Sequence, residues 1–182
     1  LVVVATRSKG LFVSIDGGQN LQQKRDEVIS VELGLNNTLY VGTDQGLYIS
    51  HDKGVSFSQN SHIKSIVYEI LYRNSSLYVA THQGIYIFKQ GVCCVPYRKK
   101  INCEPTCRVF SYGNYIFSVS WTPSSPFTLT VMDQYGGVLA KMTPSNTSNW
   151  DPKCMKIFKD KIYIAEGGKT LKVFKISNYT IS

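Results

Sequence analysis

The chain has 182 residues, of which 43% are hydrophobic, and its formal net charge is +8. These totals favour one globular domain over residues 1–182, and no apolar run approaches the ~18 residues that a membrane-spanning helix needs. The opening LVVVAT is too short for the apolar part of a secretory signal, so we expect any membrane attachment to come through segments outside this chain.

The positive charge is spread along the chain and is densest at Tyr97-Arg98-Lys99-Lys100. A basic run of this length is typical of a solvated loop. The sequence therefore predicts no nucleic-acid partner.

Short β-type segments recur from the first residues onward, each pair joined through a glycine. The matched glycines are 36 and 38 residues apart, and a period of about 40 residues built from short strands is typical of propeller blades. The paired segments are Val2–Thr6 with Leu11–Ser14 through Gly10, Leu39–Thr43 with Leu47–Ser50 through Gly46, and Leu77–Thr81 with Ile85–Phe88 through Gly84.

This repeat predicts an all-β fold, a β-propeller of four-stranded antiparallel blades. The predicted strands after the first pair are Val28–Leu35, Thr38–Thr43, Gly46–Ser50 and Val55–Gln59, then Ile63–Tyr72, Leu77–Thr81, Ile85–Phe88 and Val92–Tyr97, then Arg108–Tyr112, Tyr115–Trp121, Phe127–Asp133 and Val138–Met142, and finally Met155–Phe158, Ile162–Ala165 and Leu171–Ile176. The polar segment Thr143–Asp151 predicts a long surface loop.

The first unit lacks an inner strand and the last lacks an outer one, so about four to five blades form a partial or small ring. A propeller closes because closure removes exposed sheet edges. Either the two ends combine in a small ring, or residues 1–182 are a segment of a larger propeller, which we favour.

A polar motif, Ser50-x-Asp52-x-Gly54-x-x-Phe57, follows a predicted third strand, and Ser14-x-Asp16-x-Gly18-x-x-Leu21 is a second copy. The Asp carboxylate can accept hydrogen bonds from the N–H groups of a tight turn, and glycine allows a positive φ. The serine adds a hydroxyl, and Phe57 can cover the turn. We therefore predict structural turns.

This motif resembles the Asp-box of sialidases, sortilin-type receptors and other propellers. In that family the turns lie on the outer rim, so the resemblance implies a scaffold role for Asp16 and Asp52. The third unit departs from the pattern, because Phe88-Lys89-Gln90-Gly91 has no Asp.

Five cysteines and four glycosylation sequons favour an extracellular, secretory-pathway setting. The odd cysteine count leaves one unpaired or paired outside the chain. Cys103-x-x-x-Cys107 has tolerable zinc spacing, but no His is near, so we predict disulfides, no metal and no cofactor. The disulfide candidates are Cys93, Cys94, Cys103, Cys107 and Cys154, and the N-glycosylation candidates are Asn36, Asn74, Asn146 and Asn178.

We expect no catalysis. The Arg-Ile-Pro signature of the sialidases, which the motif resembles, is absent, and the spacing of His51, His62 and His82 suits neither a nucleophilic triad nor a zinc protease. Glu69 beside Tyr68 and Glu166 near Tyr163 are common neighbours in Tyr-rich strands. Propellers carry recognition on loops. The candidate loops are Arg7-Ser8-Lys9, Asp44-Gln45, His82-Gln83, Glu166–Lys169 and the basic, cysteine-rich insert Gln90–Thr106.

Two function hypotheses follow. The segments Gly46–Gly54 and Gly84–Ile87 resemble the extracellular propellers of accessory subunits of the sperm cation channel. That resemblance implies a non-catalytic protein-interaction module whose partners are other subunits or ectodomains of a cell-surface membrane complex. The alternative is a receptor propeller for a glycan or peptide ligand, sortilin-like or a decayed sialidase.

Overall fold

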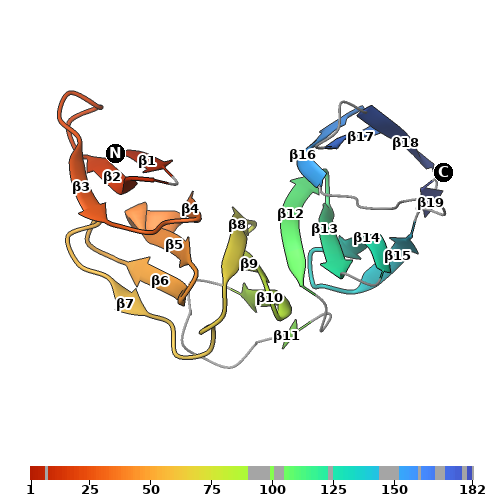
Figure 1. Cartoon of the computed structure of the whole chain (residues 1–182), viewed down its shortest axis with the longest axis horizontal. Helices are drawn as coiled ribbons and strands as arrows, with labels where there is room; N and C mark the ends of the chain where they lie inside the picture. Colours follow the sequence, from red (N-terminus) through yellow and green to blue (C-terminus); the bar gives the residue numbers. More distant parts are fainter. Residues whose placement is uncertain are drawn as a thin grey trace. The chain divides into compact units, whose positions relative to one another are not determined.

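The computed structural model describes residues 1–6, 8–89, 99–100, 105–122, 125–143, 152–159, 161–166, 171–177 and 180–181. Their strands form five antiparallel sheets, one with three strands and four with four. In every sheet the strands lie in chain order, so each sheet is a simple meander (Figure 1). The predicted all-β fold with four-stranded antiparallel blades is confirmed.

The chain divides into two compact units, Leu1–Val109 and Phe110–Ser182. The expectation that residues 1–182 form a single propeller domain stays a prediction. The first unit contains the first three sheets, which are β1 (Val2–Thr6), β2 (Gly10–Ser14) and β3 (Gln22–Arg25); β4 (Ser30–Leu33), β5 (Leu39–Thr43), β6 (Gly46–Ser50) and β7 (Ser58–Gln59); and β8 (Val67–Arg73), β9 (Ser76–Thr81), β10 (Gly84–Lys89) and β11 (Lys99–Lys100). A short 3-10 turn, η1 (Leu35–Asn37), joins β4 to β5.

The fourth sheet starts with a strand that crosses the boundary between the units. It consists of β12 (Thr106–Tyr112), β13 (Tyr115–Thr122), β14 (Ser125–Asp133) and β15 (Val138–Met142). The fifth consists of β16 (Pro152–Phe158), β17 (Lys161–Glu166), β18 (Leu171–Ser177) and β19 (Thr180–Ile181).

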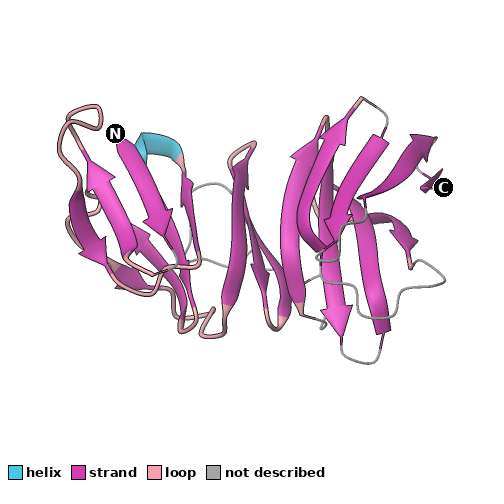
Figure 2. Ribbon diagram, turned by 45° about the horizontal axis from the view of Figure 1, so that its top comes forward, coloured by secondary structure: helices cyan, strands magenta, loops and turns pink. Residues whose placement is uncertain are grey.

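Turns within each sheet alternate between two ends, because consecutive strands are antiparallel (Figure 2). In the first unit we call one end the threonine end, since its turns follow Thr6, Thr43 and Thr81, the last residues of β1, β5 and β9. The opposite end, called the Asp-turn end, holds the turns 14–21 and 50–57. It also holds the turns that join β4 to β5 and β8 to β9.

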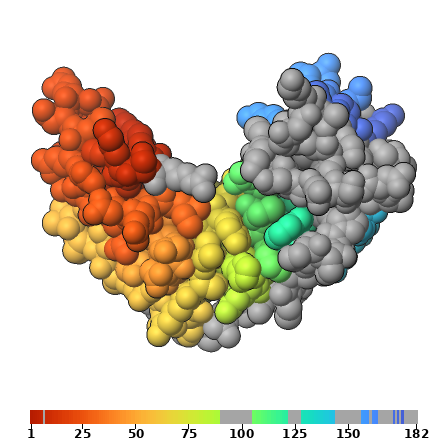
Figure 3. Space-filling model, viewed as in Figure 1, coloured from red at the N-terminus to blue at the C-terminus, as the bar shows by residue number. Residues whose placement is uncertain are grey.

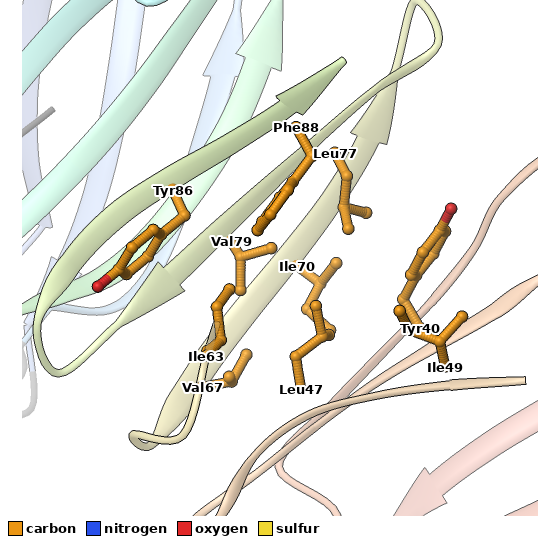
Figure 4. Close-up of a cluster of buried hydrophobic side chains, with 10 residues drawn as sticks. All are labelled: Tyr40, Leu47, Ile49, Ile63, Val67, Ile70, Leu77, Val79, Tyr86 and Phe88. Atoms are coloured by element: carbon orange, nitrogen blue, oxygen red, sulfur yellow. The ribbon is translucent and has the colours of Figure 1, made fainter. Parts of the chain in front are cut away.

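Two apolar clusters lie between the sheets of the first unit. Successive residues of β5 point to opposite faces, so Leu39 and Val41 pack with Leu11 and Val13, whereas Tyr40 packs on the other side. The second cluster, shown in Figure 4, consists of Tyr40, Leu47, Ile49, Ile63, Val67, Ile70, Leu77, Val79, Tyr86 and Phe88. Burial of each such side chain contributes about 1.5–3 kcal/mol, so these clusters hold the sheets face to face.

Aromatic rings also pack within each unit. The rings of Tyr40 and Tyr72 stack with centroids 6.1 Å apart. In the second unit the rings of Phe110 and Phe117 stack at 5.2 Å, and Leu129 and Met132 of β14 are fully buried.

Two predicted strand boundaries were wrong for identifiable reasons. The outer strand expected over Val55–Gln59 is only Ser58–Gln59, because the N–H groups of Val55 and Ser56 donate to Asp52 instead, at 3.1 Å and 2.9 Å. The strand expected from Ile63 begins at Val67.

That later start follows from Asn60. Its side-chain oxygen accepts the N–H groups of His62 and Ile63 at 2.9 Å and 3.1 Å, so this segment is a turn. The last sheet does have a fourth strand, the two-residue β19, contrary to expectation. The predicted strand Val92–Tyr97 lies outside the described residues, and the outer strand that the structure does describe there is β11.

Candidate functional site

The first Ser/Asp turn is closed by its own side chains. The Ser14 hydroxyl donates to Asp16 Oδ1 at 2.5 Å and accepts the Gly18 N–H at 2.8 Å. Asp16 also accepts the Asn20 N–H at 3.0 Å and the Asn20 side-chain amide at 2.8 Å. All of these partners lie within the turn.

The second turn repeats this arrangement with more donors. The Ser50 hydroxyl donates to Asp52 Oδ1 at 2.7 Å and accepts the Gly54 N–H at 2.8 Å. Asp52 also accepts the Val55 N–H at 3.1 Å, and the Ser56 N–H and hydroxyl at 2.9 Å and 2.6 Å. The Ser56 hydroxyl takes the place of the Asn20 amide.

These hydrogen bonds change the acidity of both carboxyls. The Ser14 hydroxyl, followed by Asn20, holds the pKa of Asp16 well below its usual range. Ser56, followed by Ser50, does the same for the pKa of Asp52. A carboxylate that is stabilised in its ionised form is a poor proton donor or acceptor near neutral pH.

The two turns differ in their apolar cover. Gly54 has φ +87 and is buried, and a Cβ there would lie 3.1 Å from Val13 Cγ2 and 3.3 Å from Leu39 Cδ1. Phe57 packs against this same cluster. Leu21, in the matching position of the first turn, is 50% exposed, so only the Phe57 copy is covered in this way.

The threonine end carries a repeated hydrogen-bond pattern that the sequence predictions missed. The Thr43 hydroxyl donates to the Gly46 carbonyl at 3.0 Å, and that of Thr81 donates to the Gly84 carbonyl at 2.7 Å. Each threonine oxygen also accepts an N–H from the turn, and Thr6 makes the same pair of bonds with Gly10 and Lys9. The threonine that ends each repeated segment was the available signal.

An aromatic and imidazole pair also lies at the threonine end. The Tyr68 hydroxyl and His82 Nδ1 are 3.1 Å apart, and the His82 N–H donates to the Ile66 carbonyl at 2.9 Å. Burial, together with the nearby Cys107, raises the pKa of Tyr68. His82-Gln83, one of the predicted recognition loops, therefore contacts β8, the first strand of its own sheet.

Two glutamates of the first unit each accept a main-chain N–H from a strand of another sheet. Glu32 of β4 accepts the Tyr72 N–H of β8 at 3.0 Å, and Glu69 of β8 accepts the Val109 N–H of β12 at 2.7 Å. Burial raises the pKa of both carboxyls, and the N–H bonds oppose that shift. Sequence predictions missed this role, because a single Glu in a β-type strand carries no signal for a bond 40 residues away.

Two of the four predicted glycosylation sites lie among the described residues. Asn36 and Asn74 are exposed at the Asp-turn end, on turns that join a first strand to a second, with φ of 53° and 48°. Asn146 and Asn178 lie outside the described residues.

Of the predicted cysteines and the remaining loops, some residues are described and others are not. Cys107 is a half-buried thiol on β12, and Cys154 lies on β16. Cys93, Cys94 and Cys103 lie outside the described residues, as do Arg7, most of Gln90–Thr106 and residues 167–169, so the disulfides stay a prediction. Among the described residues no group of three His, Cys, Asp or Glu side chains could hold a metal ion, and no helix there is long and apolar enough to span a membrane.

The sequence matches no family model, and it matches no curated protein at a significant level. Solved structures do resemble the chain. The β-propeller domain of Myceliophthora thermophila Cps50 (Swd1) gives a TM-score of 0.66 at 8% identity, covering 98% of this chain and 65% of its own. The WD40 β-propeller domain of Doa1 gives 0.59 at 17% identity, covering 88% of this chain and 54% of its own.

A third similar structure is YCF48 bound to D1 peptide, with a TM-score of 0.60 at 12% identity, covering 94% of this chain and 59% of that one. The chain thus spans between 54% and 65% of the length of these three proteins. Its fold is that of a β-propeller.

Proposed function

We propose that this chain is a non-catalytic, extracellular protein-interaction module. It serves as part of an accessory subunit in a cell-surface membrane complex such as the sperm cation channel, since its Gly46–Gly54 and Gly84–Ile87 segments resemble the propellers of that channel's accessory subunits. Its partners are other subunits or ectodomains of that complex.

One observation carries this proposal. Among the described residues, the carboxylates whose pKa is shifted are engaged within the chain itself: Asp16 and Asp52 close turns, and Glu32 and Glu69 bind the main chain of the next sheet. Carboxylates are among the common acid–base catalysts, and here they stabilise a scaffold that presents turns rigidly. Hydrolysis of a fluorogenic sialoside that is lost in Glu69→Gln would contradict the non-catalytic part.

The extracellular part is supported by the placement of two sequons. Asn36 and Asn74 are exposed on matching turns of neighbouring sheets. Glycans on both would cover the Asp-turn end of the first unit and leave the threonine end open for a partner.

Expression in a human secretory host tests this placement. We expect Asn36→Gln and Asn74→Gln each to remove one glycosidase-sensitive increment from the intact mass. If neither asparagine carries sugar, the extracellular proposal fails. Proximity labelling from the chain displayed at the cell surface tests the interaction function, and we expect labelled ectodomains that a secreted, unrelated propeller does not label.

A second candidate function is binding of a peptide or glycan at the threonine end. The Tyr68 and His82 pair favours it, because an aromatic ring beside an imidazole offers a stacking surface and two hydrogen-bonding groups. Peptide and glycan arrays probed with the chain and with Tyr68→Ala test it. Array binding that is equal for both proteins would refute this site.

A further inference from the structure

The last sheet has one face that combines lysines with apolar side chains. The register places Phe158, Lys161 and Lys175 in one row across β16, β17 and β18. Residues directly opposite each other, and residues two apart along a strand, share a face. The described side chains on this side, called the lysine face, are those of Lys156, Phe158, Lys161, Tyr163, Leu171, Val173 and Lys175.

The lysine face is exposed. Phe158 is 61% exposed, Leu171 62% and Val173 48%, and its three lysines are exposed as well. The opposite side of the sheet contains Ile162, which is fully buried. In Figure 3 the described residues of this sheet, in blue, lie at the surface of the view.

The charge on this face is of one sign. Lys161 and Lys175 lie directly opposite each other on adjacent strands, an arrangement that is destabilising for like charges. Lys159 adds a further cation, with its Nζ 5.5 Å from the centre of the Phe158 ring. None of the seven residues of the lysine face is acidic.

This face differs from the faces that pack between sheets in the first unit. The buried clusters there are aliphatic and aromatic and contain no lysine. If a similar apolar sheet covered the lysine face, three ammonium groups would lose water without gaining a partner, which is costly. A surface that covers this face stably must therefore bring carboxylates to the lysines and apolar side chains to Phe158, Leu171 and Val173.

We propose that the lysine face docks an acidic polypeptide surface in which Asp or Glu alternates with aliphatic residues. Carboxylates then pair with Lys156, Lys161 and Lys175 and relieve their mutual repulsion. The large apolar share of the face favours a protein over a nucleic acid, whose interfaces are more polar. The inference names the partner chemistry of the proposed interaction function and rests on it.

Fluorescence anisotropy tests this surface with the full chain and a labelled 12-residue peptide that alternates Glu and Val. We expect binding that weakens about tenfold when Gln replaces Glu in the peptide, and that weakens further at high salt. The triple variant Lys156→Glu, Lys161→Glu, Lys175→Glu should lose binding, and Phe158→Ala should weaken it severalfold.

The matched control is Lys9→Glu, Lys53→Glu, Lys64→Glu, which changes the net charge equally at exposed positions of the first unit. It should bind the peptide as the wild type does. Unchanged circular dichroism and melting temperature would show that both triple variants fold, since exposed substitutions usually change stability by within ~0.5 kcal/mol.

Several results would overturn the proposal: no peptide binding by the wild type, equal loss in both triple variants, or equally tight, lysine-dependent binding of a 12-nucleotide oligothymidine. Proximity labelling separates this failure from failure of the interaction function. If the lysine-face variant labels the same ectodomains as the wild type, the docking surface is wrong but the function stands. If neither labels an ectodomain, the proposed function fails.

Discussion

Replacing Ser50 by Ala removes one hydroxyl from the second Ser/Asp turn. Ser50 is 1% exposed, and its oxygen accepts the Gly54 N–H at 2.8 Å. The variant leaves that buried N–H without its acceptor, which costs about 1–3 kcal/mol. For a chain of this size 1 kcal/mol corresponds to roughly 2–4 °C, so a loss of about 2 kcal/mol lowers the melting temperature by about 4–8 °C. Differential scanning calorimetry measures this change.

Ser56→Ala is the matched control, because the Ser56 hydroxyl donates to Asp52 on the exposed side of the same turn. We expect it to change the free energy of unfolding by within ~0.5 kcal/mol. If Ser50→Ala were as mild as Ser56→Ala, the buried Gly54 N–H would not depend on Ser50. The account of the turn as a structural clamp would then be wrong.

The remaining predictions concern the threonine end and the bonds between sheets. Gly46→Ala should destabilise the chain by at least ~2 kcal/mol, because Gly46 has φ +129 and a Cβ there would collide with the Ile63 carbonyl. Chemical denaturation measures this change, and a free energy of unfolding equal to that of the wild type would contradict it. Thr81→Val keeps the shape of a fully buried side chain but removes both of its hydrogen bonds, so its melting temperature should fall by several degrees, and no fall would refute the role of the hydroxyl. Glu69→Gln keeps an oxygen for the Val109 N–H but removes a charge whose burial raises the pKa. Stability from a raised pKa is full below the unfolded value of about 4.3 and is lost as pH rises through the folded pKa, so melting curves from pH 4 to 8 should show a growing advantage of the variant, and a constant difference would refute it.

The repeated strands could be predicted because the residues that mark each strand and its turn are close together in the sequence. Leu39–Thr43 and Gly46–Ser50 are short apolar segments with a glycine at the turn between them, and they form β5 and β6 with the expected bounds at Thr43 and Gly46. The shortened strand at Ser58 could not be predicted in the same way. There a side chain, Asp52, takes the N–H groups that a strand would otherwise use.

Contacts between sheets could not be predicted from the sequence. Nothing near Glu32 in the chain marks Tyr72 as its partner, since the two meet only when β4 and β8 lie side by side. The lysine face is a similar case. Its residues are scattered over three strands, and only the register brings Lys161 opposite Lys175.

The two glutamate bonds have a consequence for how the first unit opens. The amide hydrogens of Tyr72 and Val109 are each held by a carboxylate from the preceding sheet. Each amide can exchange with deuterium only after that carboxylate withdraws. Its exchange rate therefore depends on how often β4 and β8, or β8 and β12, lose this contact. The exchange rates of these two amides therefore report contacts between sheets, and not the hydrogen bonds within one sheet.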